Sequence, residues 1–292
     1  MSQNIKHKYS PLNIFICTHK PFKVPQYIET RPDIYKIITN NVSDPFPPTK
    51  LNLYRVDKMA CDYGPEQNSC LNEWRMINAI YNMKVKAPYI GICHYRRYFM
   101  PDVIERLDMN VLTDSGYEMA IGQPVRFKDN LNGEYNNRTW WAYWHRLADY
   151  DFMESVVKKA YPELSETIDT VRECDYLYNS AMMILSRDDF NDWCEFSFDV
   201  YDLLMDAYGF KTDDDVLQYV MERKDEYAKP SLPYYNNPTQ FKRLIGFGME
   251  RFATAVWLHE KRSDGTSILD HAAEIQWFMP KEEEIELPQK NK

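Results

Sequence analysis

A short apolar segment that ends in a cluster of cations constrains this chain most. Residues 89–93 read YIGIC, with two β-branched isoleucines, which is the pattern of a buried strand. His94, Tyr95, Arg96 and Arg97 follow at once. Ligands bind at the carboxyl ends of strands in open α/β sheets, and guanidinium groups hold phosphate in a planar, bidentate way. We therefore expect a central strand whose end holds an anionic ligand, a phosphate or a diphosphate.

The same residues allow a second interpretation. An arginine pair flanked by tyrosines can form a solvated loop in which the guanidinium groups stack on the rings. It can also neutralise carboxylates inside the fold. Residue types alone leave both interpretations open.

The overall charge argues against some classes of partner. The 292 residues carry a formal net charge of −9, whereas surfaces that bind nucleic acid or anionic lipid are basic. We expect no nucleic-acid partner and at most peripheral membrane association. A stacking platform for single strands, built from Tyr95–Tyr98 and a tryptophan cluster, is the weakest alternative. The acidic runs at 213–215 and 282–284 are typical of solvated surface.

Cysteine spacing and the lengths of the apolar runs predict the compartment. Six cysteines are scattered without a CxxC pair, which indicates reduced thiols and no zinc site. No apolar run approaches the ~20 residues of a membrane span, and the N-terminus lacks the apolar segment of a signal peptide. We expect a cytoplasmic protein.

A second strand end repeats the pattern of the first. Residues 12–17, LNIFIC, run into Thr18, His19 and Lys20, as the first strand of many nucleotide-binding α/β domains runs into a polar turn. Neither GxGxxG nor GxxxxGK[ST] follows, so a dinucleotide fingerprint and a P-loop are excluded.

Strand and helix patterns alternate along most of the chain. Strands are predicted at 35–38, 117–121 and 175–185, and helices at 68–83, 188–208, 212–227 and from Pro238 or Thr239 to 258. This order predicts an α/β fold with a sheet flanked by helices and a helical C-terminal third. We expect one domain over 1–262 and an extension over 263–292, charged after about 279.

An aromatic cluster lies between the two halves of the chain. It comprises Trp140, Trp141, Tyr143, Trp144 and His145. Exposed indoles could stack on sugar rings, but aromatic runs at helical spacing are more commonly buried. We favour packed core for this cluster.

Five motifs in the same order resemble a known family. HYRRYF, preceded by YIGIC, resembles the hallmark of a bacterial glycosyltransferase family of capsular-polysaccharide and O-antigen gene clusters, formerly classed only as a domain of unknown function. The other four are ICTHK (16–20), residues 62–68 followed by Glu73, YNSAMMI (178–184) and QFKRLIGFGMER (240–251).

The resemblance implies a GT-A-like Rossmann-type fold with a mixed sheet flanked by helices, and it implies a glycosyltransferase. The implied donor is a nucleotide diphosphate sugar, with a UDP-sugar favoured and galactose or galactofuranose as the sugar. The implied acceptor is a lipid-linked or oligosaccharide glycan at the inner membrane face. The sequence departs from the family pattern at residues 63–65, so a non-catalytic glycan- or nucleotide-binding module is the alternative.

The same motifs suggest donor-binding residues. The arginine pair would neutralise the diphosphate, the first strand's turn would contact the nucleotide, and Asp62 would bind the ribose or the sugar or else cap the following helix. The donor-binding residues that we expect are Thr18, His19, Lys20, Asp62, Asn68, His94, Tyr95, Arg96, Arg97, Asn179, Arg243 and Arg251.

The candidate catalytic base is Glu250, with Asp175 as the second choice. Glu250 precedes Arg251 in the motif-bearing helix, and charge pairing is expected to keep it ionised. A purely structural Glu–Arg bridge is the alternative.

A metal is not expected to be essential. Typical GT-A enzymes hold Mg²⁺ or Mn²⁺ with carboxylates at the end of the central strand, and residues 94–97 contain none. Either ion is possible, but we expect the arginines to take over its role.

Overall fold

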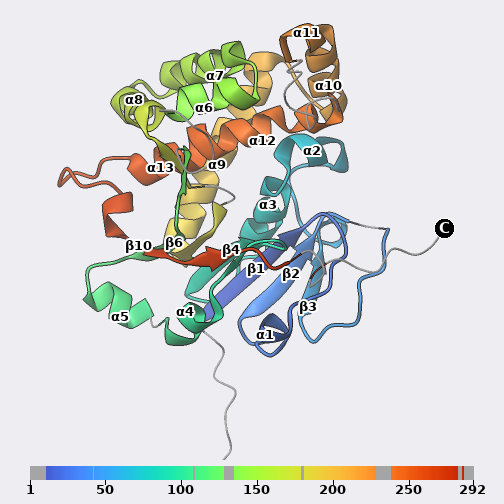
Figure 1. Cartoon of the computed structure of the whole chain (residues 1–292), viewed down its shortest axis with the longest axis vertical. Helices are drawn as coiled ribbons and strands as arrows, with labels where there is room; N and C mark the ends of the chain where they lie inside the picture. The colour runs from blue at the N-terminus through green and yellow to red at the C-terminus, as the bar shows by residue number, and fades with distance from the viewer. Residues whose placement is uncertain are drawn as a thin grey trace, which may run out of the picture.

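The computed structural model describes residues 11–41, 43–107, 109–127, 135–178, 181–227, 238–281 and 285. A seven-stranded sheet lies below a group of helices (Figure 1). Its order is β10 (Ala272–Ile275), β6 (Met119–Gly122), β9 (Met183–Ser186), β4 (Tyr89–His94), β1 (Leu12–Thr18), β2 (Tyr35–Thr39) and β3 (Asn52–Arg55).

Strand directions make this a mixed sheet. β1 pairs in parallel with β2 and β4, β2 with β3, and β10 with β6. β9 alone of the seven runs antiparallel, to both β4 and β6. The predicted α/β fold with a mixed sheet is confirmed.

The strand that carries the HYRR residues is central, as predicted, with three described strands on each side. Its side chains alternate between two cores, as the period of a strand requires. Ile90 and Ile92 pack into one core and Cys93 into the other. The strand is therefore buried on both faces, and its polar residues begin where the sheet ends.

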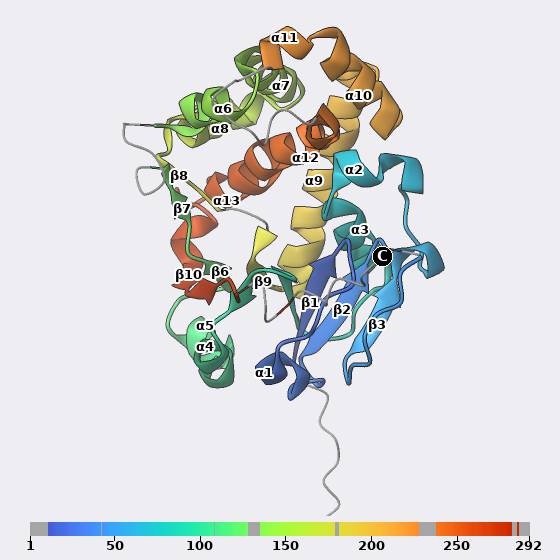
Figure 2. The same ribbon diagram turned by 45° about the vertical axis from the view of Figure 1, so that its right-hand side comes forward.

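Helices cover both faces. One face packs against α1 (Gln26–Glu29) and α4 (Pro101–Arg106), with α5 (Met109–Asp114) nearby. The other face packs against α3 (Trp74–Asn82) and the long helix α9 (Arg187–Tyr208). Beyond α9 lie α6 (Asn137–Trp144), α7 (Leu147–Ala160), α8 (Ser165–Glu173), α10 (Asp213–Glu222) and α11 (Lys224–Tyr227) (Figure 2).

Two predicted elements are divided in the structure. The strand expected over 175–185 is instead β8 (Tyr176–Leu177), which pairs with β7 (Val125–Arg126), and then β9. The helix expected over 68–83 breaks into α2 (Asn68–Leu71) and α3, because Asn72 adopts a left-handed φ of 55°. That break turns Glu73 toward the sheet edge as the N-cap of α3.

The segment after residue 262 also joins the sheets. β10 extends the main sheet beside β6, and β11 (Trp277–Phe278) pairs with β5 (Tyr98–Phe99). The aromatic cluster is packed, as predicted: Trp141 is fully buried, while Trp140 and Tyr143 are half-buried and stacked on each other.

The last helical segment brings residues from the C-terminal region over the sheet edge. It consists of η7 (Pro238–Arg243), α12 (Leu244–Met249), the π-helical η8 (Glu250–Ala255) and α13 (Val256–His259). It crosses α2 closely at Gly246, where a β-carbon would lie 3.0 Å from the carbonyl oxygen of Cys70. π-Helical turns are often found at functional sites.

The acidic run at 213–215 is not merely solvated surface. The Asp213 carboxylate accepts hydrogen bonds from the backbone amides of Ser69, at 2.8 and 3.0 Å, and Cys70, at 2.8 Å. Asp215 completes a capping box with Thr212. Asp213 therefore fixes α2, against which α12 packs.

We predict that Asp213→Ala lowers the free energy of unfolding by about 1–2 kcal/mol, because α2 loses the acceptor for its first amides. The matched control is Asp214→Ala. Asp214 is highly exposed and pairs with Lys242 at 2.8 Å, so its loss should cost less than about 1 kcal/mol. Urea denaturation measures both, and equal effects would contradict the capping role.

Candidate functional site

The carboxyl ends of β1 and β4 form the candidate site. The two strands are in parallel register, with Cys17 opposite His94, and the Tyr95 amide donates to the Cys17 carbonyl at 3.1 Å. The polar turns that follow both strands therefore lie side by side. In Figure 2 the arrowheads of β1 and β2 point toward α2 and α12, which overhang this edge.

A buried tyrosine organises the turn after β4. Tyr95 is 2% exposed, and its ring packs against Phe22 at 5.6 Å and edge-on against His19 at 5.3 Å. The Arg96 guanidinium lies 5.2 Å and the Lys20 ammonium 5.7 Å from the same ring. Arg96 and Lys20 therefore both lie close to the Tyr95 ring at the sheet edge.

The turn after β1 is shaped by Thr18. Its buried hydroxyl donates to the Lys20 carbonyl at 2.5 Å and accepts from the Lys20 amide at 3.2 Å. Thr18 thus orders the backbone of the turn, while His19 remains exposed at the surface.

Desolvation, and then neighbouring positive charge, keep both histidines neutral. Desolvation, then the charges of Arg96, Arg243 and Lys20, lowers the pKa of His19 to about 4, although its side chain reaches solvent. Burial, then the arginines, holds the pKa of His94 well below its usual range. At neutral pH the imidazoles therefore offer uncharged hydrogen-bonding groups amid cationic side chains.

Glu250 lies in the same field but is not held fully ionised. Burial, then the charge of Glu73, raises the pKa of Glu250 to about 7, against the opposing influence of Arg251, Arg243 and Arg97. The expectation that charge pairing with Arg251 keeps this carboxyl ionised is therefore wrong: desolvation and a like charge outweigh the pair. A carboxyl that titrates near neutral pH suits proton transfer.

Arg251 has a supporting position beside Glu250. It is 4% exposed, donates to the Phe247 carbonyl at 3.0 Å and lies 5.0 Å from the Trp141 ring. Its guanidinium is 3.8 Å from the Glu250 carboxylate. The described contacts of Arg251 thus anchor the helix that carries Glu250.

The structure thus brings together predicted residues from three separate stretches of sequence. Thr18, His19 and Lys20 follow β1. His94, Tyr95, Arg96 and Arg97 follow β4. Arg243, Glu250 and Arg251 come from the last helical segment.

Other predicted residues lie apart from this cluster. The Asp62 carboxylate accepts from Asn78 at 3.0 Å and Asn82 at 2.8 Å, and it lines a separate cavity of about 640 Å³ beside α3 and α9. Asp175 is exposed next to β8, 3.8 Å from Arg126. Neither shares a described contact with the cationic turns.

Asn68 and Asn179 are the two remaining predicted residues. Asn68 begins α2, and its buried side-chain oxygen accepts no hydrogen bond from the described residues. Asn179 lies outside the described residues.

Sequence reasoning did not assign Glu73 or Asn41 to the site, although Glu73 belongs to one of the five motifs. Glu73 is buried and acts electrostatically on Glu250, while the Asn41 side chain donates to the His19 carbonyl at 3.4 Å. The signal for Asn41 was available, because it follows the strand at 35–39, whose end lies at the same edge. Nothing in the sequence placed Glu73 beside a residue 177 positions later.

The donor atoms at this edge do not fit a divalent cation. Mg²⁺ and Mn²⁺ prefer several oxygen ligands, whereas the β4 turn supplies an imidazole and guanidinium groups. Among the described residues, no three His, Cys, Asp or Glu side chains are grouped so as to hold a metal.

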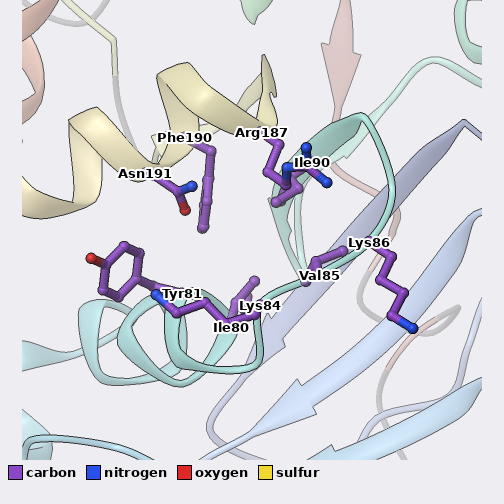
Figure 3. Close-up of a pocket in the computed structure, with 9 residues that line it drawn as sticks. All are labelled: Ile80, Tyr81, Lys84, Val85, Lys86, Ile90, Arg187, Phe190 and Asn191. Carbon is purple, nitrogen blue, oxygen red and sulfur yellow. The ribbon is translucent and has the colours of Figure 1, made fainter.

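A different cavity, drawn in Figure 3, lies at the opposite end of β4. It measures about 210 Å³ and is lined by Ile90, Lys84, Lys86 and Arg187, among others. Ile90 is four residues before His94, about 13 Å along a strand. This cavity is therefore separate from the candidate site.

The chain is similar to known proteins both in sequence and in fold. Residues 13–226 match a family described as a domain of unknown function, DUF4422. The chain belongs to the DUF4422 family. No curated protein matches it.

The fold of this DUF4422 chain is similar to that of a solved glycosyltransferase. It superposes on the apo structure of the bifunctional glycosyltransferase WbbM with a TM-score of 0.62 and 18% sequence identity. The match covers 92% of this chain and 45% of that one, so the chain spans less than half of WbbM. The sheet and this likeness establish a GT-A-like α/β fold. No described helix is long and apolar enough to cross a membrane.

The raised pKa of Glu250 predicts a pH-dependent stability. The folded-state pKa of Glu250, about 7, exceeds its usual value of 4.5, so the native state binds the proton more tightly than the unfolded state. The stability that this proton contributes is lost as the pH rises from 4.5 through 7. Glu250→Gln lacks this titrating group. Over the same pH range its free energy of unfolding should therefore rise relative to that of the wild type, by on the order of 3 kcal/mol. Urea denaturation at pH 5 and pH 8 tests this, and a constant difference between the two proteins would contradict it.

Proposed function

We propose that this DUF4422 protein is a glycosyltransferase that moves a sugar from a nucleotide diphosphate donor to a growing capsular or O-antigen-type glycan. The observation that carries the proposal is the convergence of Arg96, Arg97 and Arg243 around His94 at the carboxyl ends of β1 and β4, where their charges all lower its pKa. The glycosyltransferase named in the structural comparison supports the reaction class.

The charge balance of the site favours a diphosphate. Among the described residues, no carboxylate forms an ion pair with Arg96 or Arg243, and the Arg243 Nε atom is buried without a hydrogen-bond partner. Because a buried donor without a partner is costly, the Arg243 guanidinium is placed to donate hydrogen bonds to phosphate oxygens, with the exposed Arg96 guanidinium as a second donor.

The proposed glycosyl transfer uses the arginines and Glu250 as follows. The acceptor hydroxyl oxygen attacks the anomeric carbon of the donor as the bond from that carbon to the diphosphate oxygen breaks. Arg96, Arg97 and Arg243 stabilise the charge that develops on the leaving diphosphate. The Glu250 carboxylate takes the proton of the acceptor hydroxyl, with a pKa matched to this task.

The finer points of the proposal extend the sequence analysis. We propose a UDP-sugar of the galactose or galactofuranose type as the donor and a lipid-linked or oligosaccharide acceptor at the inner face of the cytoplasmic membrane. Residues 1–262 would form the transferase domain, with β10 and β11 of the extension completing its sheets. Asn68 and Asn179 remain predicted donor contacts, whereas Asp62 lies in a separate cavity.

We predict that Glu250→Gln lowers donor turnover roughly 10²–10⁴-fold, because the general base is lost, and leaves nucleotide binding intact. UDP release from a panel of nucleotide sugars measures turnover, and thermal shift with UDP measures binding. The wild-type rate should also rise as the pH passes through 7. Unchanged turnover in Glu250→Gln would contradict the assignment.

The matched control is Glu260→Gln, which changes a carboxylate just beyond α13 and should keep the wild-type rate. Nucleotide binding without turnover in the wild type would instead support the non-catalytic binding module.

We further predict that excess EDTA leaves donor turnover within about twofold of its untreated value, since arginines replace the metal as the source of positive charge. The control measures the same protein with added Mn²⁺. A loss of turnover in EDTA that Mn²⁺ restores would show that the arginines alone are insufficient.

A further inference from the structure

A third cavity opens beside the β10 edge of the sheet, next to the two-stranded β7–β8 sheet. It measures about 240 Å³, and its lining includes Arg126 from β7, Tyr176 from β8, Tyr178, and Glu274 from β10. None of these residues belongs to the cationic cluster at the ends of β1 and β4.

This cavity lies on the same face of the sheet as the candidate site. Side chains alternate between faces along a strand. Cys93 and Ile275 both pack into the core on the α1 and α4 side, so His94 and Glu274, each one residue away, belong to the opposite face. Both places therefore belong to the face of the sheet that α3, α9 and the last helical segment cover.

One helical segment connects the two places. Glu250 opens η8, and nine residues later His259 ends α13. The His259 Nε2 atom is 3.1 Å from the Tyr176 hydroxyl oxygen in the cavity wall. Nine residues at about 1.5 Å each give a separation of about 13 Å. A chain of sugars spans that distance, whereas the single sugar that reacts at Glu250 does not.

The lining favours a neutral, hydroxyl-rich ligand. The rings of Tyr176 and Tyr178 stand nearly perpendicular, 5.6 Å apart, and give the cavity aromatic surface. Glu274, which accepts a hydrogen bond from the Tyr178 hydroxyl at 2.7 Å, provides carboxylate oxygens for ligand hydroxyls. Arg126, 3.8 Å from Asp175 and 5.7 Å from the Tyr176 ring, provides donors.

Other ligand classes fit this lining less well. Glu274 in the lining and Asp175 beside Arg126 would repel a phosphate, and a purely apolar ligand would displace water from the charged groups without replacing its hydrogen bonds. A few converging polar groups on an aromatic wall are typical of a small-molecule site.

We propose that this cavity is an acceptor subsite, which holds a sugar residue of the acceptor glycan remote from the hydroxyl that reacts. The assignment rests on the proposed transferase function. In this arrangement Asp175, weighed above as a second catalytic candidate, pairs with Arg126 beside the cavity and takes no part in proton transfer.

The test is saturation-transfer NMR of the full chain with saccharide probes. The probes are methyl glycosides of galactopyranose, galactofuranose, glucose and N-acetylglucosamine, together with disaccharides built from them. The variants are Arg126→Ala and Glu274→Gln, both at exposed positions. The control is Lys86→Ala, an exposed cation in the cavity of Figure 3.

We expect at least one probe to receive saturation from the wild type and the control, and the signal to fall at least fivefold in both variants. Thermal shift with UDP should be unchanged in all four proteins. The subsite is wrong if no probe gives a signal at millimolar concentration, or if the variants keep it. Failure of the transferase proposal appears separately, as an absence of nucleotide binding and donor turnover in the wild type.

Discussion

The parallel register of β1 and β4 is the constraint on which the site depends. Cys17 lies opposite His94, so both strands end at the same level, and the Tyr95 amide completes the pairing by donating to the Cys17 carbonyl. Neither polar turn could shift along the sheet without moving the apolar residues of its strand out of two cores. The hydrophobic pattern of two short strands thereby fixes the place where cationic side chains accumulate.

The second determinant is the balance of charge at that edge. Burial, and then arginines that follow β4 or lie in the last helical segment, lower the pKa values of His19 and His94, and burial with the charge of Glu73 raises that of Glu250. Imidazoles that stay neutral and a carboxyl that titrates near 7 both follow from placing like charges together in a partly desolvated space. Such displaced pKa values are typical of functional sites.

The sequence was most informative where the pattern is local. The central strand, the two polar turns and the long helix α9 follow from apolar periodicity and from the residues that end each element. The strand expected over 175–185 was wrong because an apolar run does not reveal that the chain changes partner, from β7 to β4 and β6. The helix over 68–83 was broken by the φ of Asn72, which no helical spacing indicates.

Long-range electrostatics could not be predicted from the sequence. Glu250 lies beside the cationic side chains, yet its ionisation was misjudged, because Glu73 comes near it through the packing of α12 on α2 at Gly246. Asp213, which supports that packing from a distant part of the chain, was interpreted as solvated surface.

The central claim is that the cations at the ends of β1 and β4 bind a diphosphate. Isothermal titration calorimetry of UDP, UMP and uridine tests it most directly, with wild type, Arg96→Ala and Arg97→Ala. We expect UDP to bind the wild type at least tenfold more tightly than UMP, a difference of about 1.4 kcal/mol in binding free energy. This preference for UDP should weaken with added salt and should be lost in both variants. Equal affinities for UDP and uridine, or an undiminished preference in the variants, would contradict it.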